Sequence, residues 1–473
     1  MIRTRFAPSP TGYMHVGGLR TALYEFLVAK HYGGKFILRI EDTDQNRFVE
    51  GSVDTIYNAL KTAGLQYDEG PDIGGEYGPY VQSGRKEIYL KYAKELITKG
   101  KAYYCFCDKE RLSAFNEHDK YDRHCLSLSA GDVQAKLAAN TPYVIRQIIP
   151  EGETRFLDLV YGDITISNDE LDDQVLIKSD GLPTYNFANV IDDHLMEISH
   201  IMRGNEYLSS TPKYNLLYDA FGWQIPVYIH LPLIVNIHGE KLSKRKGDST
   251  FEDLLSQGYL PEAIVNFMAL LGWSPSDNTE IFSLAELIKV FDENRINKSP
   301  SIFDTQKLTW MNGEHMKRID PDKFYEMSLP VLKSAIKTPG IDLRSVSEMV
   351  RTRINFIHEI PPLVDFIDKL PEYDAELYTH KKMKTNAENS SVNLKQALQA
   401  LESLGSWDLS SIQDTLSALV QSLGIKNGQM LWPVRTALSG KPASPCGAAE
   451  LCVLLGKDES LKRIRQGIEL LLA

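Results

Sequence analysis

The sequence has few cysteines, no long apolar run, and fewer positive than negative side chains. Its five cysteines are an odd number and three of them cluster within residues 105–125, which is not the pattern of a disulfide framework. No apolar run reaches the length of a membrane span. The first residues also lack the basic segment and apolar core of a secretory signal. We therefore expect a cytoplasmic protein without a membrane anchor, and 473 residues suffice for several domains.

The formal net charge of −11 weighs against a nucleic-acid partner, because phosphate binding depends on Lys and Arg. A local basic surface is nevertheless sufficient for such binding. The C-terminal half contains these basic clusters: Lys241, Lys244, Arg245 and Lys246; Arg351 and Arg353; Lys381, Lys382 and Lys384; Lys462, Arg463 and Arg465. Each cluster alone is typical of a solvated surface, but together they make RNA binding tenable.

The N-terminus reads as a strand, a Pro/Gly loop and a helix. Residues 1–7 alternate between apolar and polar, and the following Pro/Gly segment forces a turn. The next residues repeat with the period of an amphipathic helix, and Gly17 and Gly18 lie at its expected start. The free N–H groups and dipole of a helix N-terminus favour phosphate, and His15 can donate to the same group. By itself, His-x-Gly-Gly is a weak motif that more often marks a plain loop with a surface histidine. Its place between a strand and an amphipathic helix strengthens the phosphate interpretation.

The segment R-F-A-P-S-P-T-G-Y-M-H-V-G-G-L-R-T-A-L-Y over residues 5–24 resembles the signature of bacterial-type glutamyl-tRNA synthetases, which are class I aminoacyl-tRNA synthetases. The general class I motif is His-Ile-Gly-His, and here its last place is Gly18, as is usual in this subfamily. The resemblance continues through the whole chain. It implies an α/β protein with a class I Rossmann-like catalytic domain, an inserted α+β domain and an all-α anticodon-binding region.

Composition and resemblance together predict the domain boundaries. From about residue 320 the sequence becomes helix after helix, and a Ser/Asn-rich stretch over residues 386–393 predicts a break between two helical subdomains. The predicted parts are the two halves of the catalytic domain (1–100 and 178–237), the inserted connective domain (101–177), a signature-loop and tRNA stem-contact domain (238–320), and two anticodon-binding subdomains (321–385 and 386–473).

A site for glutamate is expected after the second predicted strand, residues 35–41. Carboxylates at the end of a parallel strand lie where open α/β sheets bind ligands, and by resemblance Glu41 contacts the α-amino group. Arg203 matches the family arginine that reads the γ-carboxylate. A guanidinium fork suits a carboxylate better than an amide, which favours glutamate over glutamine, although surface ion pairs are the commoner fate of arginines. The resemblance adds further glutamate-binding residues: Arg5, Ala7, Ser9, Tyr185 and Asn189.

Two later segments frame the second half of the catalytic domain. Residues 184–194 are expected to form a strand followed by a loop, with Tyr185 and Asn189 on one side of a local helical turn. The pattern of residues 226–237 strongly predicts a strand, with His230 near its middle.

The sequence H-G-E-K-L-S-K-R from residue 238 resembles the class I Lys-Met-Ser-Lys-Ser loop. Two lysines three residues apart on such a loop can close over a triphosphate and neutralise charge as pyrophosphate leaves. Surface lysine loops are abundant, so the prediction depends on the pairing with His-x-Gly-Gly. The expected ATP-binding residues are His15, Gly17, Gly18, Lys241, Ser243 and Lys244. Of these, we expect His15, Lys241 and Lys244 to be catalytic.

The inserted domain carries a predicted structural zinc site, because closely spaced thiols followed by a third favour tetrahedral zinc. Relatives with a tyrosine ligand use Tyr-x-x-x-Cys, which matches Tyr121, whereas many others place a His where this chain has Ser127. His124 is a further candidate, and three unliganded cysteines are the alternative to a zinc site. The favoured ligands are Cys105, Cys107, Tyr121 and Cys125.

The resemblance implies that L-glutamate is activated with ATP and Mg²⁺ to glutamyl-adenylate and transferred to the 3′ end of tRNA-Glu, releasing AMP and diphosphate. Whether tRNA-Gln is also charged stays open, and a monomer is the expectation for the family. Arg351 or Arg353 lies where the family carries a residue that reads the anticodon. One alternative is the short paralogue that glutamylates a modified tRNA base, but it lacks the helical part. Others are a non-catalytic tRNA-binding protein and an adenylyltransferase of the same superfold.

Overall fold

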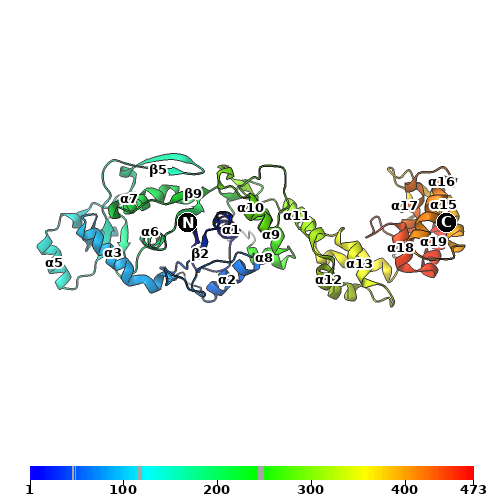
Figure 1. The fold of residues 1–473 in the computed structure, drawn as a ribbon, viewed down its shortest axis with the longest axis horizontal. Coiled ribbons are helices and arrows are strands. Elements are labelled where there is room, and N and C mark those ends of the chain that lie inside the picture. The colour runs from blue at the N-terminus through cyan, green and yellow to red at the C-terminus, as the bar shows by residue number, and fades with distance from the viewer. Residues whose placement is uncertain (45–46, 48, 114–119, 243–249, 473) are drawn as a thin grey trace. The chain divides into compact units, whose positions relative to one another are not determined.

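The computed structural model describes all residues except 45–46, 48, 114–119, 243–249 and 473. The chain divides into two compact units, Met1–Leu308 and Thr309–Ala473 (Figure 1). Within the part of the chain that the structure describes, no helix is long and apolar enough to cross a membrane.

Short parallel strands form the centre of the first unit. Strands β1 (Arg3–Phe6) and β2 (Lys35–Leu38) pair in parallel, and both strands expected near the N-terminus are thereby confirmed. A second sheet has the order β6-β5-β9-β8 and pairs β9 in parallel with both β5 and β8. Its strands are β5 (Glu153–Asp158), β6 (Gly162–Ser167), β8 (His200–Gly204) and β9 (Val227–Leu231). Strands β10 (Ile234–Val235) and β11 (Ser301–Ile302) form a further parallel pair.

Helix α1 (Val16–His31) is largely buried. It packs against β1, β2 and β8 on one side and against α9 (Pro261–Ala269) and α10 (Leu284–Val290) on another. The sequence predicts an amphipathic helix here, but even Arg20 and Glu25 are buried. A charged group inside the protein needs partners, so these two side chains hold neighbouring elements together.

The inserted segment contains a separate antiparallel sheet of order β3-β4-β7. Its elements are β3 (Ala102–Cys105), α4 (Lys109–Ser113), α5 (Ala130–Ala138), β4 (Val144–Gln147) and β7 (Val175–Ile177). In Figure 1, α5 lies at the end of the unit farthest from α9 and α10. The remaining helices of the unit are α2 (Ser52–Thr62), α3 (Lys86–Thr98), α6 (Tyr185–Leu195), α7 (Thr211–Phe221) and α8 (Phe251–Ser256).

The expected strand and loop over residues 184–194 are wrong, because this segment is helix α6. Its β-branched and aromatic residues suggest a strand, but Phe187, Val190 and Ile191 recur at helical spacing and are all buried. The local helical turn expected around Tyr185 and Asn189 is therefore part of a longer helix.

The second unit is built of helices, which confirms the predicted all-α region. Helix α11 (Thr305–Arg318) runs across the boundary between the units. The others are α12 (Pro321–Ala335), α13 (Leu343–Arg351), α14 (Ile360–Val364), α15 (Ala387–Glu402), α16 (Leu409–Ser422), α17 (Asn427–Ser439), α18 (Ala448–Leu455) and α19 (Lys457–Leu472). The Ser/Asn-rich stretch begins helix α15, because the Asn386 side chain accepts a hydrogen bond from the Asn389 N–H at 2.9 Å and caps the helix.

Candidate functional site

A cavity of about 300 Å³ opens at the carboxyl ends of β1 and β8, beside the N-terminus of α1 and the turn after β9. Ligands of open α/β sheets bind at such a position. Among the residues that line it are Arg5, Ala7, His15, Gly17, Gly18, Tyr185, Arg203 and Lys241. Ser9 is exposed on the loop after β1, and Glu41 and Asn189 are buried outside the lining. Ser243 and Lys244 lie outside the described residues.

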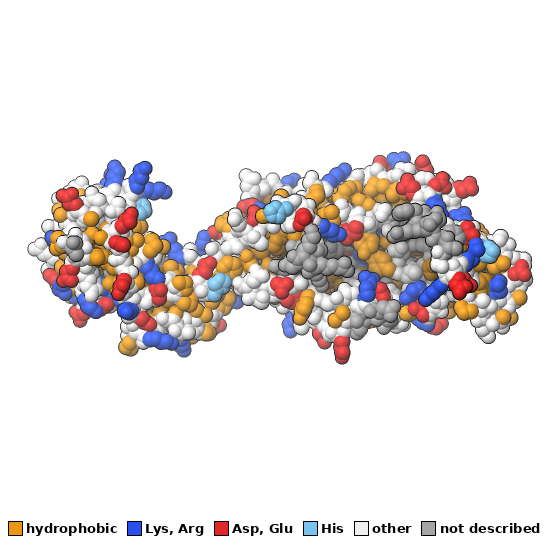
Figure 2. Space-filling model, turned by 180° about the vertical axis from the view of Figure 1, so that it is seen from behind, with side chains coloured by type: hydrophobic (Ala, Val, Ile, Leu, Met, Phe, Trp, Pro, Cys, Tyr) orange, Lys and Arg blue, Asp and Glu red, His pale blue; other side chains and the backbone are white. Residues whose placement is uncertain are grey.

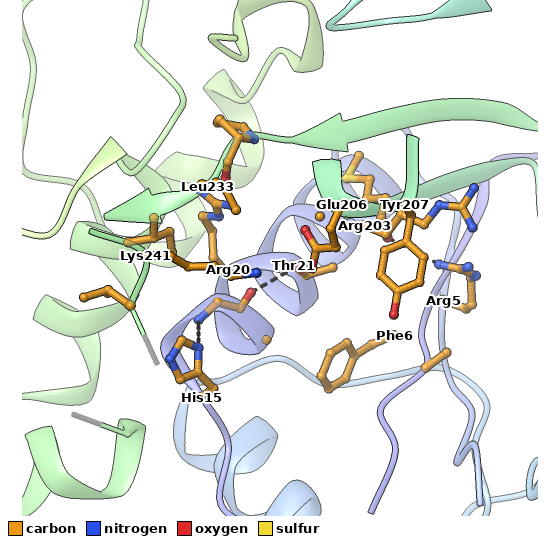
Figure 3. Close-up of a pocket in the computed structure, with 18 of the residues that line it drawn as sticks. Arg5, Phe6, His15, Arg20, Thr21, Arg203, Glu206, Tyr207, Leu233 and Lys241 are labelled. Carbon is orange, nitrogen blue, oxygen red and sulfur yellow. Dashed lines mark hydrogen bonds between the residues drawn. The ribbon is translucent and has the colours of Figure 1, made fainter. Parts of the chain in front are cut away.

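His15 caps helix α1, because its Nδ1 accepts a hydrogen bond from the Gly17 N–H at 3.1 Å. A neutral imidazole that accepts through Nδ1 carries its proton on Nε2, so Nε2 is a donor. Gly18 has only the Met14 sulfur near its missing Cβ, at 3.9 Å. In Figure 3, His15 and Lys241 lie on one side of the cavity. That side combines the positive end of a helix dipole with two potential donors, which suits phosphate.

The other side of the cavity carries Arg203, next to Tyr207 (Figure 3). Arg203 as a residue is 6% exposed. Its guanidinium donates from Nε to His230 and from Nη2 to Thr211, and is surrounded by tyrosine rings. No carboxylate of the described residues pairs with it. A buried cation without a counter-ion is costly, and a ligand carboxylate would supply the missing charge.

Arg5 reaches the same cavity but is already paired inside the protein. It lies 3.2 Å from Glu25 and 3.0 Å from Asp193. Burial raises the pKa of Glu25 to about 8. Burial also acts to raise the pKa of Asp193, but Arg5 and Arg39 together lower it. Arg5 therefore helps to form the wall of the cavity, with its charge largely compensated.

Glu41 follows β2 and is 3% exposed. One of its carboxylate oxygens accepts from Arg39 Nη2 at 3.0 Å, whereas the other has no hydrogen-bond partner among the described residues. Burial raises the Glu41 pKa to about 7, against the opposing effect of Arg39. The buried side-chain nitrogen of Asn189 is also unsatisfied. Unsatisfied buried polar atoms are costly and uncommon, so the Glu41 oxygen and the Asn189 nitrogen are suited to bind a polar ligand.

Sequence reasoning missed Arg20, which also lines the cavity. Its guanidinium donates to the backbone carbonyls of Leu271, at 3.0 Å, and Pro232. Arg20 thereby ties α1 to the turn after β9 and to the end of α9. Its place, with Glu25, among the few charged residues of a largely apolar helix was the signal that could have pointed to it.

Comparison with known proteins agrees with this geometry. The family model for the catalytic domain of class I tRNA synthetases (E and Q) matches residues 1–310, and the anticodon-binding domain model matches residues 323–468. The chain belongs to the class I tRNA synthetases. The glutamate–tRNA ligases of Clostridium novyi and Lachnoclostridium phytofermentans are each 60% identical to it, covering 99% of the chain and 98% of each relative.

A solved structure is similar over the same extent. The glutamate tRNA ligase from Elizabethkingia meningosepticum, in complex with its amino acid, has a TM-score of 0.84 and 35% identity, covering 99% of both chains. The class I catalytic fold and the helical anticodon region predicted from the sequence are confirmed, and the protein is an ATP-dependent aminoacyl-tRNA ligase.

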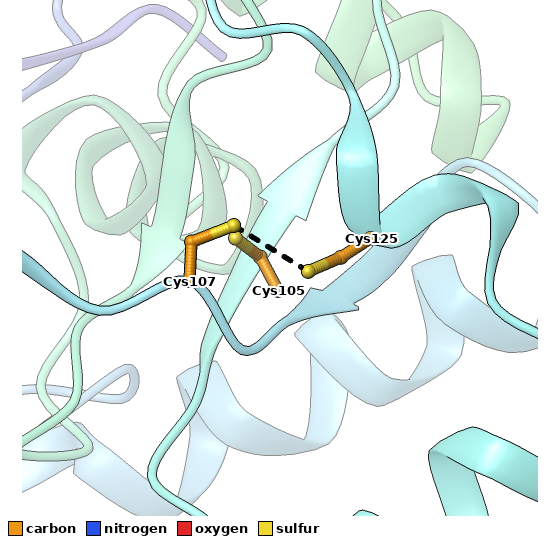
Figure 4. Close-up of side chains that lie close together, drawn as sticks. All are labelled: Cys105, Cys107 and Cys125. Carbon is orange, nitrogen blue, oxygen red and sulfur yellow. Dashed lines mark hydrogen bonds between the residues drawn. The ribbon is translucent and has the colours of Figure 1, made fainter. Parts of the chain in front are cut away.

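The synthetase also has a cluster of three thiols in its inserted domain (Figure 4). The sulfur atoms of Cys107 and Cys125 lie 3.6 Å apart, and the Tyr121 hydroxyl lies 3.2 Å from the sulfurs of both Cys105 and Cys107. In a tetrahedral site with metal–sulfur bonds of about 2.3 Å, sulfur atoms lie roughly 3.8 Å apart. These four groups therefore fit a closed metal site, whereas the side chains of His124 and Ser127 are exposed.

Protonation of these groups also bears on metal binding. Burial raises the pKa of Cys107 to about 11 and raises that of Tyr121, to which the neighbouring thiols contribute. Both groups are thus protonated in the metal-free protein, and a bound cation has to displace these protons.

The two arginines considered for anticodon reading differ sharply in their surroundings. Arg351 ends α13 and donates to the backbone carbonyls of Lys317 and Ile319, so it terminates a neighbouring helix. Arg353 is exposed, and its side chain makes no hydrogen bond or ion pair with the described residues. On the face shown in Figure 2, Lys and Arg side chains gather at one corner of the smaller unit. Lys381, Lys382 and Lys384 are exposed, whereas Arg463 is buried against backbone carbonyls.

Proposed function

We propose that the protein is a glutamate–tRNA ligase that activates L-glutamate with ATP and transfers it to the 3′ end of tRNA-Glu. The observation that carries the proposal is Arg203, a buried cation without a counter-ion among the described residues, in one cavity with the N-terminus of α1 and Lys241. One side of this cavity suits the carboxylate of the substrate side chain, and the other suits phosphates. Glutamate and ATP need such a pair of subsites.

The glutamate side chain would place its γ-carboxylate on Arg203. Its α-ammonium group would bind Glu41, whose second oxygen is unsatisfied, and Asn189 would complete the polar surroundings. The other residues of the proposed glutamate site are Arg5, Ala7, Ser9 and Tyr185. A glutamine amide would leave the charge of Arg203 uncompensated, which supports the choice of glutamate.

The phosphates of ATP would lie at the start of α1. His15 would donate from Nε2, and the backbone at Gly17 and Gly18 allows close approach. Lys241, with Ser243 and Lys244, would approach the same phosphates, and Mg²⁺ would accompany ATP. The α-carboxylate of glutamate then attacks the α-phosphorus, and diphosphate leaves with its charge held by these donors. The ribose hydroxyl of the tRNA attacks the acyl carbon next, and AMP leaves.

Zinc would have a structural role in the inserted domain. Cys105, Cys107, Tyr121 and Cys125 would hold one ion, because their ligand atoms converge and leave no position for a substrate. Among the described residues no general base is evident beside them, so the ion would stabilise the fold of β3 and the segment that follows it.

Recognition of tRNA would use the helical unit. Arg353 is the better candidate for anticodon contact, because Arg351 is bound to the backbone. We keep the predicted boundaries, with anticodon-binding subdomains over residues 321–385 and 386–473. Discrimination between tRNA-Glu and tRNA-Gln is left to measurement, and the expected state is a monomer.

The loop assignment is tested by Lys244→Ala, with Lys246→Ala as the matched control. We expect Lys244→Ala to lower the rate of glutamate-dependent exchange between ATP and pyrophosphate, measured with tRNA present, by about 100-fold. The melting temperature should stay unchanged and the control should keep most of the activity. An unchanged exchange rate in Lys244→Ala would refute the assignment.

A further inference from the structure

Three buried side chains from neighbouring strands form a chain of hydrogen bonds behind the cavity. They are Asp158 at the end of β5, His230 in β9 and Arg203 in β8, and Asp158 and His230 are fully buried. His230 Nδ1 lies 2.7 Å from an Asp158 carboxylate oxygen, and Arg203 Nε lies 3.2 Å from His230 Nε2. Only Arg203 reaches the cavity lining, so the other two act on a ligand through it.

The hydrogen bonds fix the protonation of His230. Arginine has no acceptor, so its Nε–H must donate and His230 Nε2 must present a lone pair. The imidazole proton then lies on Nδ1 and is donated to Asp158. Burial also lowers the pKa of His230, and Arg203 acts in the same direction, so the ring is neutral.

Asp158 is held firmly in this arrangement. One carboxylate oxygen accepts from the backbone N–H groups of Val160, at 3.0 Å, and Tyr161, at 2.8 Å. The other accepts both the imidazole proton and the backbone N–H of His230. The imidazole therefore has a rigid anchor, and its Nε2 lone pair is directed at Arg203.

The hydrogen bonds occupy one edge of the Arg203 guanidinium. Nε donates to His230 and Nη2 donates to Thr211 Oγ1 at 3.0 Å, while the Thr211 hydroxyl donates to the Tyr207 carbonyl. The N–H groups of Nε and Nη2 lie along the same edge of the planar group. The outer edge, formed by Nη1 and Nη2, remains for a bidentate ligand.

We infer that His230, anchored by Asp158, is a positioning residue that holds Arg203 with its outer guanidinium edge toward the cavity and thereby sets the preference for a substrate carboxylate. The inference rests on the proposed function, since it concerns the residue that would read the γ-carboxylate.

The alternative is that His230 only fills space in the core. A space-filling role requires a ring of similar volume, whereas a positioning role requires an acceptor at the Nε2 position. His230→Phe keeps the ring and removes the acceptor. His230→Gln gives up the ring and can place an amide oxygen near the position of Nε2, so the two variants separate the roles.

The experiment measures tRNA-Glu charging by wild type, His230→Phe and His230→Gln, with glutamate and glutamine as competing substrates. We expect His230→Phe to lower kcat/KM for glutamate by about 10- to 100-fold, the effect of losing a hydrogen bond to a charged group. The ratio of kcat/KM for glutamate to that for glutamine should fall with it, and the KM for ATP should stay unchanged. His230→Gln should recover a large part of both losses.

Equal losses in the two variants, or a loss that leaves the glutamate-to-glutamine ratio unchanged, would overturn the inference. If His230→Phe does not fold, Thr211→Val carries the test, because it removes the acceptor of Nη2 from the same guanidinium edge. We expect a smaller fall of the same ratio in Thr211→Val, and an unchanged ratio would contradict the inference. Wild-type protein that charges no glutamate at all would instead refute the proposed function.

Discussion

The chemistry of the site depends on how each buried charge is compensated. Arg3, Arg5 and Arg39 all have carboxylate partners inside the protein, at 2.8 to 3.2 Å. Among the described residues, Arg203 and Arg20 have none: Arg203 donates to the neutral side chains of His230 and Thr211, and Arg20 donates to backbone carbonyls. Both Nη groups of Arg20 are used in this way, whereas Arg203 uses only Nε and Nη2, so Arg203 is the arginine suited to a ligand carboxylate.

Glu41 offers a pH-dependent test at the scale of a single residue. Its pKa is raised to about 7 by burial, and only the ionised form attracts an ammonium group. Raising the pH from about 6 to 8 should therefore tighten glutamate binding by about tenfold. The same shift means that ionisation of Glu41 lowers the stability of the ligand-free protein as pH rises through about 7.

The measurement is titration calorimetry of L-glutamate at a series of pH values. Glu41→Gln should bind glutamate more weakly and lose this pH dependence, because the amide does not ionise. A pH dependence of binding that persists in Glu41→Gln would assign the titration to another group, with Glu25 the nearest candidate.

At the scale of elements, the start of helix α1 has two glycines in different surroundings, one close to a side chain and one with space around it. A Cβ at Gly17 would come within 3.2 Å of His15 Nδ1, whereas one at Gly18 would meet, among the described residues, only the Met14 sulfur at 3.9 Å. The described packing around α1 therefore does not require a glycine at position 18. Because Gly18 lines the cavity, the absence of a side chain at this position has a functional explanation.

Gly18→Ala should fold normally, with an unchanged or slightly higher melting temperature, because alanine favours helix over glycine by about 1 kcal/mol. The KM for ATP should rise by about tenfold, since the methyl group intrudes on the proposed phosphate subsite. Thermal unfolding and charging kinetics measured on the same preparation would check both parts. A normal KM for ATP would place the phosphates elsewhere.

The inserted domain makes a separate prediction about metal content. Protein purified without chelators should carry about one zinc per chain by atomic absorption. Tyr121→Phe should lower zinc retention during dialysis, because it removes the proposed fourth ligand, whereas the matched variant His124→Ala should retain the metal. If only His124→Ala loses zinc, His124 and not Tyr121 is the fourth ligand. Wild-type protein without zinc would show that the cluster is not a zinc site.

Local patterns in the sequence predicted the elements near the site well. The strands around Arg5 and Glu41 and the helix after His15 follow directly from alternation, turn residues and helical periodicity. Long-range pairings were not predictable in this way. Nothing in the local sequence indicates that Arg5 pairs with Asp193, or that His230 joins Asp158 to Arg203. Those contacts arise only when strands distant in sequence become neighbours.

At the scale of the whole molecule, the account assigns glutamate activation and tRNA recognition to two units with different secondary structure. The unit of residues 1–308 contains the mixed α/β elements and the cavity, and the unit of residues 309–473 is helical. The acidic net charge does not prevent RNA binding, because exposed basic residues are concentrated locally in the helical unit.

Arg353 and Arg351 form a matched pair for testing tRNA recognition. Arg353→Ala should raise the KM for tRNA-Glu by about tenfold while leaving the melting temperature and the KM for glutamate unchanged, because the side chain is exposed. Arg351→Ala should instead lower the melting temperature, since its donors cap backbone carbonyls of the neighbouring segment. The reverse pattern would show that Arg351 is the residue that reads the tRNA.

The measurement that tests the central claim most directly is charging of separate tRNA-Glu and tRNA-Gln transcripts with labelled glutamate, ATP and Mg²⁺. The account predicts acid-precipitable glutamyl-tRNA-Glu together with release of AMP and diphosphate. Charging of tRNA-Gln as well would define a non-discriminating enzyme of the same kind. Folded protein that charges neither transcript would contradict the account.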